Sequence, residues 1–120
     1  MEKVQGIGGF FFRSEDPGSL ANWYLENLGI SLVPTDATTM PWVSDAGPVV
    51  FAPFAADTEY FAPEKSFMLN FRVGDLDKML VQLRGNGIEV SQETEMEGVG
   101  RFARIHDPEG NAIELWEPAS

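Results

Sequence analysis

Cysteine is absent from this chain of 120 residues, so disulfide bonds, thiolate metal ligands and cysteine nucleophiles are all excluded. Histidine occurs only once, as His106. Basic residues are also few: 8 lysines and arginines stand against 19 aspartates and glutamates, and the net charge is −11. This charge opposes binding to nucleic-acid backbones and to anionic membrane surfaces, so we expect neither as a partner.

Long apolar runs are missing as well. No stretch approaches the roughly 18 apolar residues that characterise a membrane-spanning helix. Residues 1–6 show no basic region followed by an apolar segment, which is the pattern of a secretion signal. We therefore expect a cytoplasmic protein, and the length fits a single domain covering residues 1–120.

The chain does contain an internal repeat. Phe12-Arg13-Ser14-Glu15-Asp16 and Phe71-Arg72-Val73-Gly74-Asp75 are similar and lie about 60 residues apart. Each copy is followed by a helix-like segment and then by a Gly-Ile step. The repeat predicts two related modules, residues 1–60 and 61–120, each too small to bury a core alone. A ligand is expected in the space between them.

Two helices are predicted from their boundary residues. Asp16 and Pro17 are typical of a helix start, and Gly29 is typical of its end. Asp75 is expected to begin a second helix, because the apolar residues after it recur at i, i+3, i+4 and i+7. These apolar residues are Leu76, Met79, Leu80 and Leu83.

Strands are expected around both helices. Three adjacent phenylalanines in residues 7–13 predict a strand covered on both faces. Residues 30–54 predict short strands interrupted by prolines, and residues 55–65 a linker whose Tyr60 and Phe61 either pack on the other half or cover a ligand. The second module predicts strands at 67–73, from 88 onward, at 102–106 and at 112–117, with a turn at 107–110. The order β-α-β-β-β, twice, indicates an α+β domain with mixed or antiparallel sheets.

Two segments carry a family resemblance. Asp-Pro followed by Trp23-Tyr24 and Leu28-Gly29 in the first half, and Arg104-Ile105-His106-Asp107-Pro108-Glu109-Gly110-Asn111-Ala112-Ile113-Glu114-Leu115 in the second, resemble the glyoxalase/bleomycin resistance/dioxygenase superfamily, also called vicinal oxygen chelate proteins. The resemblance spans residues 6–118. It implies two βαβββ modules related by pseudo-twofold symmetry, with curled mixed sheets that enclose a cavity, and it implies a homodimer.

Enzymes of this superfamily usually hold a divalent metal ion at four strand positions. Mapped onto this chain, the four positions are Gly9, Phe51, Met68 and Glu114. Only Glu114 suits a hard or borderline cation, and a catalytic metal site needs about three protein ligands. We therefore expect no metal and no cofactor, and we interpret His106 as a structural or solvent-facing residue.

Strand alternation predicts which residues share a face, and the family resemblance implies that the face with Phe102, Arg104 and His106 also points into the cavity. Phe10, Phe12, Leu69 and Phe71 are expected beneath the helices. The inward face combines arginines, which suit carboxylate or phosphate, with apolar walls. An alternative from the same residues is an internal ion network in which Arg13 or Arg104 pairs with Glu114. The expected ligand-binding residues are Phe11, Arg13, Phe51, Met68, Asn70, Arg72, Phe102, Arg104, Glu114 and Trp116.

Three functions are compatible with this pattern. The first is a metal-free protein that binds a small organic molecule, with an anionic amphipathic compound as one candidate, and that sequesters it, as bleomycin resistance proteins of this fold do, or senses it. The second is a lyase, isomerase or dioxygenase-type enzyme in which Glu114 acts as base or as sole retained metal ligand, assisted by His106 or an arginine. The third is a dimer-forming partner domain without a ligand. The sequence names no ligand and leaves catalysis undecided.

Overall fold

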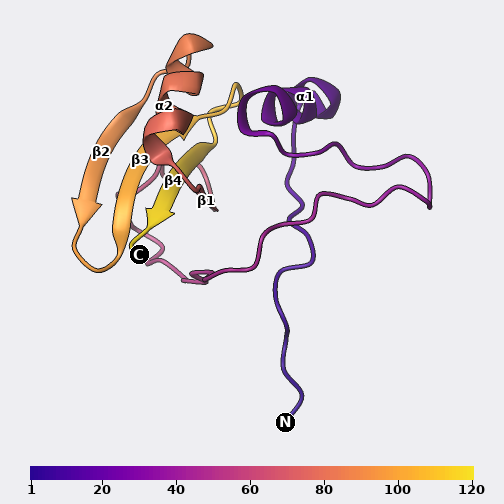
Figure 1. The fold of residues 1–120 in the computed structure, drawn as a ribbon, viewed down its shortest axis with the longest axis horizontal. Coiled ribbons are helices and arrows are strands. Elements are labelled where there is room, and N and C mark those ends of the chain that lie inside the picture. The colour runs from indigo at the N-terminus through magenta and orange to yellow at the C-terminus, as the bar shows by residue number, and fades with distance from the viewer.

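Two helices and one four-stranded mixed sheet make up the regular secondary structure of the chain, and the computed structural model describes all of residues 1–120 (Figure 1). The strands lie in the order β1-β4-β3-β2; β1 runs parallel to β4, and the other neighbours are antiparallel. The elements are α1 (Pro17–Leu28), β1 (Leu69–Arg72), α2 (Leu76–Gly85), β2 (Ser91–Met96), β3 (Gly100–His106) and β4 (Ala112–Pro118). The predicted α+β fold with a mixed sheet is confirmed.

Both helices begin, and α1 ends, as their boundary residues predict. The Asp16 side chain accepts a hydrogen bond from the Ser19 N–H at 3.1 Å, and the Asp75 side chain accepts one from the Lys78 N–H at 3.0 Å. These carboxylates satisfy N–H groups that have no partner within the helix. Gly29 ends α1 in the left-handed conformation, at φ 71°, which glycine adopts without steric cost.

The core lies between the helices and one face of the sheet. The apolar stripe predicted on α2 lies there, and Phe12, Leu69 and Phe71 pack against this core as expected, whereas Phe10 is 48% exposed. Because side chains alternate along a strand, the other sheet face carries the remaining residues of β1, β3 and β4. The buried core residues are Leu20, Tyr24, Leu76, Leu80, Leu83, Ala103, Ile105, Ile113 and Leu115.

The turn between β3 and β4 is tied to α1. The Gly110 N–H donates to the Asp107 carbonyl at 3.0 Å, as the predicted turn requires. The Asp107 carboxylate is buried and accepts hydrogen bonds from the Tyr24 hydroxyl, at 2.6 Å, and from Asn111. Burial, and then the hydrogen bond to Asp107, raise the pKa of Tyr24, so its hydroxyl stays a donor.

The strands expected in the first module are not formed. Outside α1, residues 1–68 contain no helix and no strand, so the predictions for 7–13 and 30–54 were wrong. Apart from α1 and its caps, only two backbone hydrogen bonds form within these residues, from Thr58 to Ala55 and from Lys65 to Ala62. A strand needs a neighbouring strand, and no strand pairs with these segments, which run outside the sheet (Figure 1). Of the two modules, only the second is built as a βαβββ unit.

Smaller differences concern strand ends. β1 begins at Leu69 rather than at 67, and β2 begins at Ser91 rather than at 88. The register of β2 shifts between Ser91 and Thr94, which marks a bulge. Every residue of β2 is exposed. Neither helix has the length and apolar character that crossing a membrane requires.

Candidate active or binding site on the open sheet face

The sheet face that points away from the helices is named here the open face. It carries the residues that alternate with the core residues on β1, β4 and β3. Pairing places Asn70 opposite Glu114, Glu114 opposite Arg104, and Phe102 opposite Trp116. Polar and aromatic side chains from three strands therefore meet on one surface. The open face consists of Asn70, Arg72, Phe102, Arg104, Glu114 and Trp116.

Glu114 lies at the centre of the open face and is held by neutral donors. Its Oε1 accepts a hydrogen bond from Asn70 Nδ2 at 2.8 Å, and its Oε2 accepts one from the Tyr60 hydroxyl. Glu114 forms no ion pair; the two ion pairs of the chain lie elsewhere, at Arg84–Glu93 and Arg101–Asp77. The alternative, an ion network in which Arg13 or Arg104 pairs with Glu114, is therefore not formed.

Arg104 is a buried cation whose hydrogen bonding is incomplete. Arg104 is only 5% exposed. Its Nη2 donates a hydrogen bond to the Tyr60 carbonyl at 3.1 Å, and its guanidinium carbon lies 4.9 Å from the centre of the Tyr60 ring. The ring face attracts the cation. Nε is also buried and has no acceptor. A buried donor without a partner costs free energy, so this nitrogen marks a place where an acceptor is missing.

Phe102 and Trp116 form the apolar side of the open face. Their rings are parallel, at an angle of 3°, with centres 6.2 Å apart. Trp116 is buried, and its indole N–H donates to the Val99 carbonyl at 2.9 Å, which fixes the ring. The open face thus joins a flat apolar surface to a carboxylate and a guanidinium.

Tyr60 comes from the irregular linker 55–65, named here the Tyr60 segment. Tyr60 is 45% exposed and touches the Phe54 ring, with ring centres 5.7 Å apart. Burial, the hydrogen bond to Glu114 and the charge of Glu114 raise the pKa of Tyr60, so the phenol remains protonated and donates. The sequence singled out Tyr60 only as an aromatic that packs or covers a ligand, and no periodicity placed it against Glu114.

The other expected site residues lie apart from this cluster. Phe11 and Phe51 are 94% and 90% exposed, so within one chain they form no wall of a site. Arg13 is exposed and forms no ion pair. The Arg72 guanidinium turns to the first half of the chain, where Nη2 donates to the Asp45 carbonyl at 2.9 Å. Met68 is partly buried just before β1.

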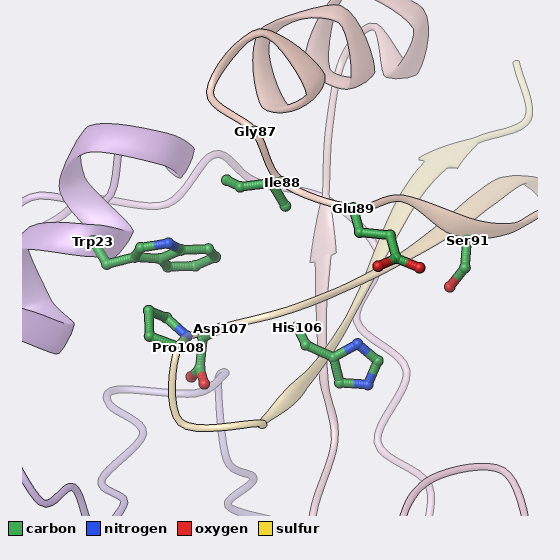
Figure 2. A pocket seen from close by; sticks show the side chains of 8 residues that line it. All are labelled: Trp23, Gly87, Ile88, Glu89, Ser91, His106, Asp107 and Pro108. Atoms are coloured by element: carbon green, nitrogen blue, oxygen red, sulfur yellow. The ribbon is translucent and has the colours of Figure 1, made fainter.

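A hollow with a volume of about 370 Å³ lies between α1, the α2–β2 connection and the β3–β4 turn (Figure 2). Trp23 and Ile88 give it an apolar end, while Glu89 and His106 stand at the other (Figure 2). Its buried carboxylate, Asp107, is already saturated by hydrogen bonds. His106 is exposed, which agrees with a solvent-facing residue. We place the candidate site on the open face, where a buried donor lacks its acceptor. The hollow is lined by Trp23, Gly87, Ile88, Glu89, Ser91, His106, Asp107 and Pro108.

The sequence profile of the glyoxalase-like domain matches residues 9–116, nearly the whole chain. The chain belongs to the glyoxalase-like domain family. The resemblance found in the sequence is thereby confirmed. No protein with a curated description matches the sequence.

Solved structures similar to this glyoxalase-like domain include TnmS3, an antibiotic binding protein from Streptomyces sp. CB03234, at 24% identity and a TM-score of 0.66, with 99% of this chain and 100% of that chain covered. A glyoxalase/bleomycin resistance protein from the same organism is 26% identical, with a TM-score of 0.54, and the match covers 86% of this chain and 92% of that chain. A bleomycin resistance determinant encoded on the transposon Tn5 is 19% identical, with a TM-score of 0.54, and the match covers 89% of this chain and 92% of that chain.

The metal site implied by the family does not fit this glyoxalase-like domain. Of the four mapped positions, Phe51 is exposed, and Gly9 and Met68 offer no hard ligand. Both oxygens of Glu114 already accept hydrogen bonds, and Arg104, a cation, lies opposite it in the sheet. Nowhere do three His, Cys, Asp or Glu side chains gather as a cation site would require. We therefore derive no metal-dependent step.

Proposed function

We propose that this glyoxalase-like domain binds a small organic molecule on the open face, without a metal ion, and thereby sequesters or senses it. The observation that carries the proposal is Arg104, a buried guanidinium whose Nε has no acceptor. A ligand oxygen could supply that acceptor, and the parallel rings of Phe102 and Trp116 offer apolar surface beside it. Apolar surface with a few convergent polar groups is typical of small-molecule sites.

Antibiotics are the first compounds to test. Two structural neighbours are described as an antibiotic binding protein and a bleomycin resistance determinant. Their fold is shared, and fold alone does not set function. The antibiotics are selected by this analogy, whereas the residues proposed to bind them are those of the open face.

Thermal shift and calorimetry with bleomycin and a panel of small aromatic acids and antibiotics test the proposal. We expect at least one compound to raise the melting temperature of the wild-type protein. Arg104→Met should weaken its binding by roughly 1.5–3 kcal/mol, the range for hydrogen bonds to charged groups. Arg84→Met is the matched control, because Arg84 is half exposed and paired with Glu93 away from the open face. A panel without any binder, or equal losses in both variants, contradicts the proposal and favours a partner domain without a ligand.

Binding is better supported than catalysis. An enzyme of the lyase or isomerase type would use Glu114 as base together with a second group that donates or stabilises charge. Neither His106 nor an arginine hydrogen-bonds with Glu114, whose partners are Asn70 and Tyr60. The proposal therefore assigns Glu114 to ligand recognition.

We also propose a homodimer in which the first half of one chain covers the open face of the other. Residues 1–16 and 29–54 have strand-like sequence but no strand partner within the chain. Their large apolar side chains are exposed, which is typical of a surface that another chain covers. A second copy carries the matching module, as the sequence repeat indicates. The exposed residues of these segments include Phe10, Phe11, Val33, Val43, Val49, Val50 and Phe51.

A further inference from the structure

We propose that Tyr60 occupies the place of the ligand, and that the site binds a hydroxylated aromatic carboxylate by displacing Tyr60. This inference rests on the proposed function and names the ligand class. It follows from three contacts that Tyr60 makes, through its side chain and its backbone carbonyl, with Glu114 and Arg104 on the open face.

The contacts of Tyr60 describe what the site accepts. Its hydroxyl donates to Glu114 Oε2, its ring lies under the Arg104 guanidinium at 4.9 Å, and its carbonyl accepts from Arg104 Nη2 at 3.1 Å. A compound with a phenol at one end, an aromatic ring and an acceptor oxygen at the other end can make the same three contacts. Glu114 selects the hydroxyl, because a carboxylate left without its donor weakens binding strongly.

Tyr60 fills the site incompletely, and the gap indicates a carboxylate. Nε and Nη2 of an arginine lie on the same edge of the guanidinium and form a fork of two donors. The Tyr60 carbonyl takes Nη2, while Nε has no acceptor. One carbonyl oxygen occupies half of the fork; a carboxylate has two oxygens and can occupy both halves. We therefore expect a carboxylate to bind more tightly than the corresponding amide.

The Tyr60 segment is attached weakly enough to leave. It contains no helix or strand, its hydrogen bonds between backbone groups are the two from Thr58 to Ala55 and from Lys65 to Ala62, and the Tyr60 N–H donates to the Thr58 hydroxyl at 3.2 Å. Lys65 Nζ also donates to the Glu109 carbonyl at 3.2 Å. Segments with few buried contacts open at low free-energy cost. A ligand that offers a better acceptor than the Tyr60 carbonyl can therefore replace it.

Isothermal titration with three small probes tests the inference. The probe 3-(4-hydroxyphenyl)propanoate reproduces the ring, hydroxyl and carbonyl carbon of a tyrosine and adds the second oxygen. Its amide lacks that oxygen, and 3-phenylpropanoate lacks the hydroxyl. The proteins are the wild type, Tyr60→Ala, Tyr60→Phe and the matched control Glu59→Gln, whose side chain lies next to Tyr60 in the chain and makes no hydrogen bond.

Removing Tyr60 should strengthen binding of the first probe. If the tyrosine occupies the site nine-tenths of the time, its removal lowers the dissociation constant about tenfold. Tyr60→Phe, which keeps the ring and loses the contact with Glu114, should lie between wild type and Tyr60→Ala, and Glu59→Gln should match the wild type. In Tyr60→Ala, the amide and 3-phenylpropanoate should each bind several-fold more weakly than 3-(4-hydroxyphenyl)propanoate.

Equal or weaker binding of the first probe by both Tyr60 variants overturns the inference, and so does equal binding of the three probes. The phenylalanine variant guards against a loss of folding in the alanine variant, because it removes one oxygen only. The proposed function is judged separately by the compound panel and Arg104→Met. One outcome separates the two. A panel compound whose binding is weakened by Arg104→Met, is not displaced by 3-(4-hydroxyphenyl)propanoate and is unchanged by Tyr60→Ala supports the proposed function and contradicts this inference.

Discussion

Glu109 ties the entry into α1 to the turn between β3 and β4. Its carboxylate accepts hydrogen bonds from the Ser14 hydroxyl at 2.7 Å and from the backbone N–H groups of Glu15 at 3.1 Å and Asp16 at 3.4 Å. The bond from Ser14, followed by the bond from Glu15, lowers the pKa of Glu109 below its usual 4.5. The ionised carboxylate is therefore the form that holds the two halves together at this point.

Replacing Glu109 should destabilise the fold in a pH-dependent way. A carboxylate whose pKa is lower in the folded state contributes stability above its unfolded pKa and loses it as the pH falls through the folded value. Glu109→Gln should therefore lower the melting temperature at pH 7, and the difference from wild type should shrink below about pH 4.5. Thermal melts at pH 7, 5 and 3 measure this, with Glu97→Gln on the β2–β3 turn as control. A difference that stays constant down to pH 3 contradicts the prediction.

The residues of the open face could be predicted only in part from the sequence. Alternation along β3 and β4 placed Arg104 and Glu114 on one face, because the period of a strand is two. The partner of Glu114 could not be predicted, because Tyr60 lies on an irregular segment whose path has no period. The guanidinium of Arg104 stacks on Tyr60 instead of pairing with Glu114, and that choice depends on where the segment runs.

At the scale of elements, α2 offers a matched test of the core. Leu83 is 0% exposed and belongs to the core, while Val81 on the same helix is 72% exposed. Leu83→Ala should reduce the free energy of unfolding by roughly 3–5 kcal/mol, since it removes buried methyl groups and leaves a cavity. Val81→Ala should change it by less than about 0.5 kcal/mol. Urea denaturation measures both, and similar losses in the two variants would show that α2 packs with a different face.

The helices and the strands of the second module were predictable because their signals are local. Asp16 and Asp75 cap helices whose apolar residues recur at helical spacing, and the turn at 107–110 separates two strands. Segments 7–13 and 30–54 carry the same kind of apolar residues, yet they form no strand. The apolar residues of a strand can be read from its own sequence, whereas its formation depends on a partner strand elsewhere.

At the scale of the whole molecule, a single chain is less compact than its length allows. Its radius of gyration is 15.3 Å, against about 13.6 Å for a typical folded chain of this length. Its 45 backbone hydrogen bonds compare with roughly 80 for such a chain. The shortfall lies in the first half, which agrees with the proposal that a second copy completes the structure.

Light scattering should therefore give a mass of twice 13.3 kDa at micromolar concentration. Val49→Asp and Phe51→Asp should shift the protein toward the monomer, because a charge in an interface opposes burial. Val81→Asp is the control: its side chain is exposed too, but it lies on α2, outside the first half. A monomeric wild type, or a monomer produced equally by Val81→Asp, contradicts the homodimer.

The two edges of the sheet differ in a way that limits how copies can add to one another. The outer strand β2 carries Glu93 and Glu95, is exposed along its whole length and contains a bulge, all features that discourage a further strand from pairing. The opposite edge, β1, is only four residues long and uncharged apart from Arg72. If β1 pairs with β1 of a second copy, only the two β2 edges remain free, and these discourage a third copy, so pairing of this kind would end at two chains.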